Sequence, residues 1–254
     1  MAPPRPVAAA AAPVHPAIIN VSLYQLTVPA GAVSANPDFW KWVDPPSIDD
    51  ATISRLDENG LRVGEAAISD WSNFRKIFDA AGASAIEHHF IGPGAENQEF
   101  APSAELGQET LFFYDAHGLS GRVYDQCQNL FILSYRPAPA PAGARASATD
   151  GAIRLECCPM VRGTRRQLHY TVLNDEETVE YKSDERIFDL GLRVDLPPGR
   201  FLIVAPSAQS QRAMSIGHAF LTQDATAGRR ETVLIFVAGY PPKVQSAVNA
   251  TPQQ

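Results

Sequence analysis

Residues 232–237 read TVLIFV, a run with no charged residue and with apolar side chains at odd and even positions alike. Successive side chains of a strand point to opposite faces, so such a run needs apolar cover on both faces. We therefore expect residues 232–237 to form a central strand of a sheet. Upstream, Pro197-Pro198-Gly199 separates the apolar segments 192–196 and 201–205, and this spacing predicts a hairpin.

Around this run, apolar and polar residues alternate with a period of two. The alternation is clearest at 153–157, 168–172 and 188–196. Shorter apolar or β-branched runs of strand length occur earlier in the chain, at 18–28, 61–66, 86–91, 110–114 and 130–135. Turns containing glycine or proline separate many of these segments. The pattern predicts antiparallel strands with one face in water.

Two short helices are predicted before residue 83. The first covers about 47–59, opens at Ser47 and stops at Asn59-Gly60, because glycine tolerates the left-handed conformation. The second covers about 69–81 and is capped by Ser69. Its apolar residues recur along one face: Trp71, Phe74, Ile77 and Phe78. The predicted fold class is therefore α+β and strand-dominated, with mixed or antiparallel sheets and these two helices.

The 254 residues carry a formal net charge of -7, which argues against a general affinity for nucleic acid. The sequence lacks an apolar run of the length that a transmembrane helix requires. We expect a flexible Ala/Pro leader at 1–17, one β-rich domain at 18–240 and a disordered tail at 241–254. The low-complexity segment 137–150 either divides two subdomains or forms a long loop between two strands of one sheet.

Three cysteines are too few for a disulfide framework: Cys127, Cys157 and Cys158. A bridge from Cys127 to one of the other two is one alternative, and buried free thiols are the preferred one. The sequence contains no phosphate-binding loop, dinucleotide fingerprint, Cys-x-x-Cys pair, nucleophile elbow or His-Glu-x-x-His helix. No cofactor is predicted.

Two groups of residues are candidates for chemistry. His88 and His89 could bind a metal, but neighbours on a strand diverge to opposite faces, so we expect one partly buried and one exposed histidine. Ser215, His218 and Asp224 could form a dispersed hydrolase site. Such a site requires the fold to place a nucleophile, a base and an orienting carboxylate together. Gly217, between Ser215 and His218, is expected to serve a turn.

Two further groups are candidates for binding. An exposed ligand platform could use any of three aromatic residues: Trp40, Trp42 or Tyr114. The alternative for the two tryptophans is that they cap one end of the core. Three basic residues lie in a predicted hairpin turn: Arg162, Arg165 and Arg166. They either meet an acidic neighbouring subunit or are simply solvated.

Four features follow one another in the second half of the chain: a strand ending in proline at 153–159, a strand pair across a glycine turn at 192–206, a Ser-Ile-Gly…Phe segment at 215–220 and an apolar strand led by Glu-Thr at 231–237. This succession resembles the C-terminal β-region of the secretins, the ring-forming outer-membrane channels of bacterial secretion systems. The strand at 18–28 and the helix with Trp71 and Phe74 match that region as well, so the resemblance covers about 18–240.

The sequence departs from the secretin pattern in three ways. The family's Gly-Gly-Leu is replaced by Ile203-Val204-Ala205, and its Pro- and Gly-rich segment is reduced to 215–217. An amphipathic membrane hairpin is also missing, which counts against formation of a pore. Residues 39–44 and 59–64 also resemble segments shared by an uncharacterised bacterial family of unknown function.

These observations predict a non-enzymatic structural or interaction protein that associates with itself or with a partner protein. The resemblance implies a component of a bacterial envelope or secretion assembly. One alternative is a ligand-binding β-domain for carbohydrate or peptide, and another is a hydrolase with a dispersed Ser/His/Asp site. The expected location is the cell envelope or periplasm if the resemblance holds, and the cytoplasm if Met1 is the true start.

Overall fold

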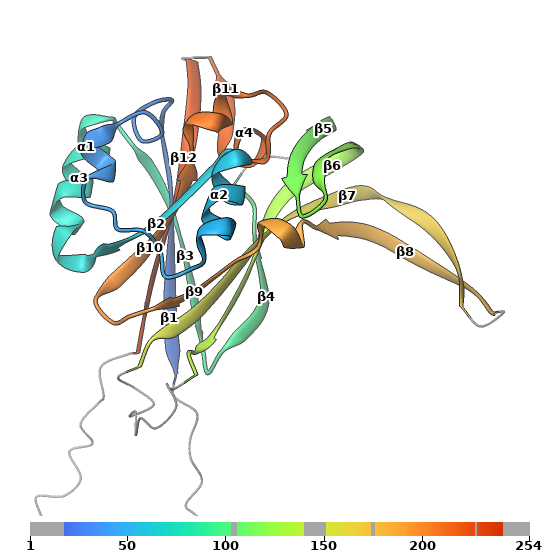
Figure 1. The fold of residues 1–254 in the computed structure, drawn as a ribbon, viewed down its shortest axis with the longest axis horizontal. Coiled ribbons are helices and arrows are strands. Elements are labelled where there is room, and N and C mark those ends of the chain that lie inside the picture. Colours follow the sequence, from blue (N-terminus) through green and yellow to red (C-terminus); the bar gives the residue numbers. More distant parts are fainter. Residues whose placement is uncertain (1–17, 103–105, 140–150, 174–175, 227, 241–254) are drawn as a thin grey trace, which may run out of the picture.

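The computed structural model describes residues 18–102, 106–139, 151–173, 176–226 and 228–240, with the backbone alone at residue 106 and at 164–183. Strands dominate it, in two antiparallel sheets (Figure 1). The predicted strand-dominated α+β class is therefore confirmed. The predicted leader at 1–17, the predicted tail at 241–254 and residues 140–150 of the predicted linker lie outside the described residues.

Each sheet has six strands. Sheet A has the order β2 (Leu61–Ala67), β10 (Arg200–Pro206), β12 (Gly228–Gly239), β1 (Ile19–Pro29) and β3 (Ser84–Gly92), with β11 (Thr222–Ala225) also on β12. Sheet B has the order β4 (Ala95–Phe100), β6 (Gly118–Pro137), β7 (Ile153–Leu173) and β8 (Glu176–Arg186), with β5 (Leu106–Asp115) on β6 and β9 (Leu192–Leu196) on β7.

Strand β12 is the centre of the molecule. It lies between β10 and β1, as its continuous apolar run predicts. Leu234 and Phe236 point into the core between the two sheets, whereas Val233 and Ile235 point into a second core under the helices. All four side chains have no exposed surface. Sheet A is therefore a middle layer with apolar cover on both faces.

In the part of the chain that is described, four α-helices accompany the sheets: α1 (Pro37–Trp40), α2 (Asp50–Glu58), α3 (Trp71–Ala80) and α4 (Ile216–Leu221). Three 3-10 turns lie between elements: η1 (Ile68–Asp70), η2 (Phe188–Leu190) and η3 (Ala208–Gln211). Helices α1 and α3 cover the face of sheet A that points away from sheet B (Figure 1). The Phe74 ring contacts Phe39 and Phe201 edge to face, which joins α3 to α1 and to β10.

The two predicted helices exist, but their predicted starts are wrong. Helix α2 begins at Asp50, because the Asp49 side chain accepts a hydrogen bond from Thr52 N at 2.9 Å and so caps it. The N–H of Ser47 donates instead to Glu65 Oε1. Ser69 lies in η1, and α3 starts without a side-chain cap. The predicted stop at Gly60 is confirmed, with a φ of +83°.

Two predictions for residues 188–206 are also wrong. Phe188–Leu190 forms η2 rather than a strand, and the strand starts at Leu192. The Pro197–Gly199 turn does not close a hairpin, because β9 pairs with β7 in sheet B and β10 belongs to sheet A. Alternation reports that one face of a strand is buried, but it does not report which strand is the neighbour.

Strands β6 and β7 flank the predicted linker and pair directly with each other, with Pro137 opposite Ile153. The segment between them therefore joins neighbouring strands of one sheet, as in the second alternative for 137–150. Beyond this ladder, β7 and β8 continue as a two-stranded hairpin that projects from the body (Figure 1).

Candidate functional site

Ser215, His218 and Asp224 each have a structural partner. The Ser215 hydroxyl caps α4 by accepting a hydrogen bond from His218 N at 3.3 Å. The His218 ring places Nδ1 3.0 Å from the Ser210 carbonyl oxygen. Asp224 is exposed on β11 and accepts a hydrogen bond from Arg229 Nε. Among the described residues no carboxylate bonds to the His218 ring, so the orienting group of a catalytic triad is not in place.

The two adjacent histidines point to opposite faces of β3, as strand geometry requires. His88 stacks on Phe90 at 6.5 Å between ring centroids and is partly buried. His89 is exposed, lies 3.1 Å from Ser22 Oγ and pairs with Glu87 at 3.3 Å. The described residues contain no cluster of three or more side chains that could hold a metal ion.

The three candidate aromatic residues do not form one platform. Trp40 is only 8% exposed, its Nε1–H donates to Val33 O, and the Arg62 guanidinium lies 3.9 Å from its ring centre. An exposed role for Trp40 is therefore wrong, because its ring closes the core under α1. Trp42 is 37% exposed, with Lys41 over its ring. Tyr114 lies in the other sheet, on β5.

The hairpin turn predicted around Arg162, Arg165 and Arg166 is wrong, since all three lie inside β7. The register between β7 and β8 shifts between Arg162 and Gln167. Gly163 therefore lies at an irregularity inside a long strand rather than in a turn. The Arg162 guanidinium forms bidentate bonds to Glu99 and to Asp184 at 2.7–3.0 Å. The side chains of Arg165 and Arg166 lie outside the described residues.

All three cysteines are free. Cys127 and Cys157 are also buried, as in the preferred alternative, whereas Cys158 is half-buried. Burial raises the pKa of the Cys127 thiol to about 11, and it raises the pKa of the Cys158 thiol to about 11 as well. It also raises the pKa of the fully buried Cys157. The thiolate is the reactive form, so these thiols are poor nucleophiles at neutral pH.

Strand β3 forms an edge of sheet A. Within the described ranges it pairs with β1 and with no other strand. None of its nine residues is buried, and its register with β1 is continuous from Ser84 to Gly92. Ile86 is 57% exposed and Ile91 is 69% exposed. Among the described residues, the outer side of β3 thus presents regular backbone N–H and C=O groups without a strand partner, beside apolar side chains.

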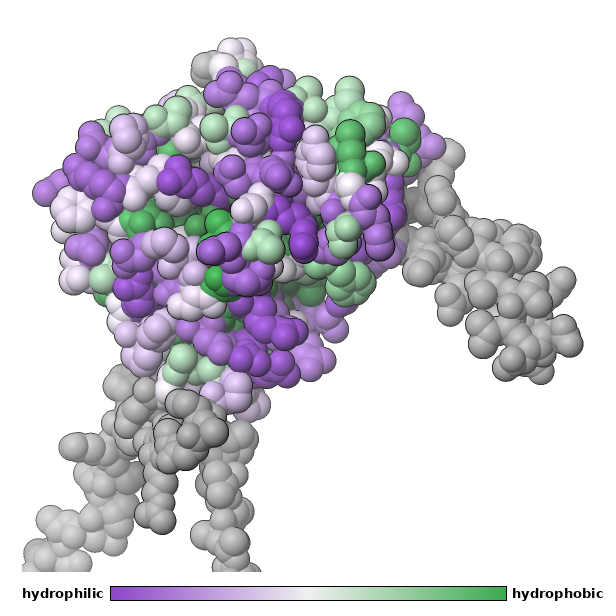
Figure 2. All heavy atoms as spheres, viewed as in Figure 1, coloured by the Kyte–Doolittle hydropathy of each residue, from purple (hydrophilic) through white to green (hydrophobic). Residues whose placement is uncertain are grey.

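A second exposed apolar group lies on the hairpin formed by β5 and β6 (Figure 2). Its members are Phe112, Leu119 and Val123. We call it the β5–β6 patch. It belongs to sheet B, whereas β3 belongs to sheet A, so the two apolar surfaces are on different sheets.

A groove crosses the outer face of sheet B. It consists of two adjoining parts with volumes of about 480 Å³ and about 450 Å³. Both parts are lined by Ser134, Glu156 and Arg186, which makes them continuous. We call it the arginine groove, after four arginines that line it: Arg136, Arg154, Arg186 and Arg193.

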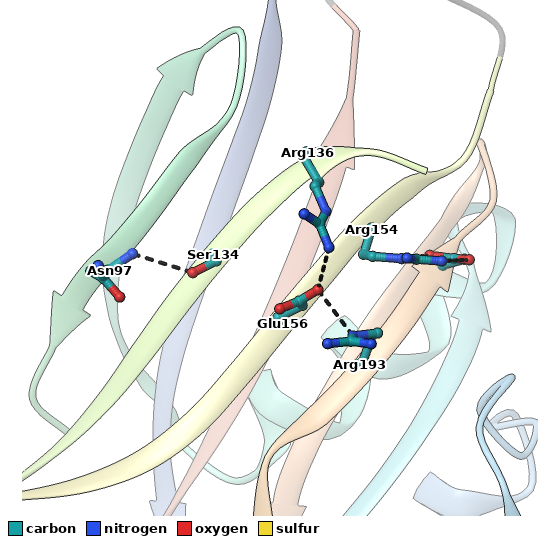
Figure 3. A network of polar contacts seen from close by, with 7 residues as sticks. Asn97, Ser134, Arg136, Arg154, Glu156 and Arg193 are labelled. Carbon is teal, nitrogen blue, oxygen red and sulfur yellow. Dashed lines mark hydrogen bonds and ion pairs between the residues drawn. The ribbon is translucent and has the colours of Figure 1, made fainter. Parts of the chain in front are cut away.

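Glu156 lies at the centre of the arginine groove. Its Oε1 accepts hydrogen bonds from Arg136 Nη2 and from Arg193 Nε, each at 3.0 Å. The two arginines reach it from β6 and β9, on either side of β7 (Figure 3). Two guanidinium groups therefore share one carboxylate oxygen and keep further N–H donors free for other acceptors.

The other two arginines differ from each other. Arg154 forms a bidentate ion pair, because its guanidinium binds both oxygens of Asp195 at 2.6 and 2.7 Å and holds the pKa of that carboxyl below its usual value. Arg186 donates to the neutral side-chain oxygen of Asn97 at 2.9 Å. In the part of the chain that the structure describes, no carboxylate lies within ion-pair distance of Arg186.

Asn97 takes an unusual conformation at the wall of the arginine groove. Its φ is +58°, in the left-handed region that residues other than glycine seldom adopt. The register between β4 and β6 shifts here, between Ala95 and Gln98, which indicates a bulge. The Asn97 N–H donates to Ser134 Oγ at 3.2 Å, so the bulge is held against β6 (Figure 3).

Sequence reasoning missed the arginine groove. The only available signal was that Arg154, Glu156 and Arg193 fall on the wet faces of predicted strands. Without the strand order, nothing indicates that β9 lies beside β7 and brings Arg193 to Glu156.

No protein-family model, curated protein or solved structure matches this chain. The resemblance to secretins therefore stays a prediction. Among the helices that the structure describes, none has the length and apolar character needed to cross a membrane.

Proposed function

We propose that the protein is a non-enzymatic interaction protein that associates with a second copy of itself through β3. The observation that supports this proposal is the edge of sheet A that has no strand partner among the described residues, a regular nine-residue strand without a buried residue. An open edge is a template for pairing with another strand. Antiparallel pairing of two β3 strands would join two A sheets into one continuous sheet across a two-fold axis.

The β3 sequence is complementary to itself in this arrangement. If the axis passes through His88, each Glu87 lies opposite the His89 of the second copy, and each Ile86 lies opposite Phe90. Ala85 then faces Ile91. Carboxylate–imidazole and apolar cross-strand pairs both favour pairing.

Several of the usual protections of an exposed edge are missing from β3. Native proteins block such edges with proline, lysine, bulges or very short strands. Strand β3 contains neither proline nor lysine, and its ladder with β1 has no shift. A component of a bacterial envelope or secretion assembly, which the resemblance to secretins implies, would use an edge of this kind to meet its neighbours.

Light scattering coupled to size-exclusion chromatography tests the proposal at tens of micromolar protein. We expect a dimer, and we expect Ile91→Lys to raise its dissociation constant at least about tenfold, because lysine on an edge strand opposes the addition of another strand. Val123→Lys is the matched control, since Val123 is 63% exposed but belongs to the β5–β6 patch. A strictly monomeric wild-type protein, or equal effects of the two substitutions, would overturn the proposal.

A further inference from the structure

We propose that the arginine groove binds an organic carboxylate whose anionic group is attached to an apolar group. The source of this chemistry is either a small carboxylic acid or the terminal carboxylate of a peptide. The inference does not depend on association through β3, because the groove lies on sheet B.

The arrangement of donors favours a carboxylate ligand. Glu156 presents one carboxylate oxygen to Arg136 and Arg193. The Glu156 carboxylate thus occupies the position that the carboxylate of a ligand would take. Arg136 and Arg193 are more than half exposed and can turn toward a ligand without unfolding a core. Guanidinium groups match the planar geometry of a carboxylate and bind it with two parallel bonds.

Arg186 provides N–H donors that no carboxylate among the described residues accepts. Its described partner is the Asn97 amide oxygen, and the strained conformation of Asn97 holds that oxygen at the wall of the groove. Strain of this kind persists where the surrounding structure maintains it, and it is often found beside binding sites. Asn97 is therefore a positioning residue for the Arg186 guanidinium.

The second part of the groove provides the apolar contact. Ile132 and Leu192 line it from below, and the Phe188 ring stands beside them with 74% of its surface exposed. An aromatic ring this exposed offers apolar area that a bound apolar group would remove from water. A ligand that spans both parts would place its carboxylate at the arginines and its apolar group on Phe188.

The groove is not a general trap for anions. Glu96 and Asp49 also line it, and the charges of these two acids and of Glu156 balance those of Arg136, Arg186 and Arg193. The Asp49 carboxylate is engaged in capping α2. A free inorganic anion gains only the arginine contacts, so we expect selection for a ligand with both a carboxylate and an apolar group.

Titrations of the full chain followed by NMR test the inference. The probes are 3-phenylpropionate, its uncharged amide 3-phenylpropanamide, inorganic sulfate, and a tripeptide that ends in phenylalanine with either a free or an amidated terminus. We expect the two carboxylates to bind at least tenfold more tightly than their amides and more tightly than sulfate. The stronger of the two carboxylates identifies the source of the ligand. Equal binding of acid and amide contradicts the inference.

Three variants separate a binding role from a structural one. Arg186→Gln should weaken binding of the carboxylate at least tenfold. Glu156→Gln should strengthen it about threefold or more, because it removes the internal competitor for Arg136 and Arg193. Arg75→Gln, at an exposed pair on α3, should change nothing. Unchanged binding in Arg186→Gln, or weaker binding in Glu156→Gln, overturns the inference. Repeating the titration with the Ile91→Lys variant, in which self-association should be weakened, shows whether carboxylate binding is independent of the proposed dimer.

Discussion

Replacing Gly217 with alanine tests how α4 is attached to the rest of the fold. Gly217 is buried in the first turn of α4, where its N–H donates to the Asn59 carbonyl oxygen at 2.8 Å. A Cβ at this position would overlap the carbonyl group of Gly60 and lie 2.8 Å from Gly60 Cα. The predicted role of Gly217 in a turn is therefore wrong, because its lack of a side chain permits backbone to approach backbone.

The expected loss of stability follows from this contact. Ordinary contact between carbon atoms needs about 3.5–4.0 Å, so α4 has to move by roughly 1 Å or more, and no rotamer relieves a clash with backbone. Overpacking of this kind costs about 1–3 kcal/mol, and a lost backbone hydrogen bond adds about 1 kcal/mol. Alanine returns up to about 1 kcal/mol through its helix propensity. We expect a net loss of about 2 kcal/mol, or a fall in Tm of roughly 4–8 °C.

Urea unfolding followed by circular dichroism measures this loss. Gly107→Ala is the control, because a Cβ at Gly107 meets no atom within 4 Å and its φ is not positive. We expect the control to stay within about 1 kcal/mol of the wild-type protein. If Gly217→Ala costs less than about 1 kcal/mol, the close packing of α4 on the Gly60 turn is refuted.

Two further substitutions test buried polar groups. The buried Asn59 side chain donates to Tyr114 O and accepts from Tyr114 N, both at 2.8 Å, so Asn59→Ala should cost about 2–3 kcal/mol in urea unfolding by leaving two backbone groups of β5 unpaired. Burial raises the pKa of the Glu109 carboxyl from 4.5 to about 6. The folded state therefore binds the Glu109 proton more tightly than the unfolded state does. The contribution of this proton to the free energy of unfolding is fully present below pH 4.5 and is lost as the pH rises through about 6. Glu109→Gln should be more stable than wild type at pH 7.5, with an advantage that disappears near pH 4; a constant difference across this range would contradict the burial of Glu109.

Local signals predicted the elements well where one residue pattern has one physical meaning. The apolar run at 232–237 avoids water only if other apolar side chains pack against both of its faces, and both faces of β12 are packed in this way. The stripe of Trp71, Phe74, Ile77 and Phe78 predicted α3, and Asn59-Gly60 predicted the end of α2. Helix starts were less predictable, because Ser47 and Asp49 are both good caps and only the tertiary contact of Ser47 N with Glu65 separates them.

The candidate site depended on pairings that a single sequence does not specify. The arginine groove needs β6, β7 and β9 side by side, and it needs the bulge in β4 that turns Asn97 toward Arg186. The uncovered edge of β3 is likewise a property of the strand order. Neither the groove nor the edge position of β3 can be predicted from the alternation of apolar and polar residues, because every half-exposed strand shows the same period of two whichever strand lies next to it.

The sequence by itself determined most of the long strands, the helices α2 and α3, and which of their faces avoid water, because these are short-range consequences of side-chain polarity and backbone preference. It did not indicate the short helices α1 and α4 or the 3-10 turn η2. Only the tertiary structure decided that β9 and β10 separate into different sheets, that β3 is left at an edge, and that Arg136 and Arg193 meet on Glu156. Strand order results from long-range packing of the whole chain, in which many locally equivalent partners compete and the best combined burial selects one.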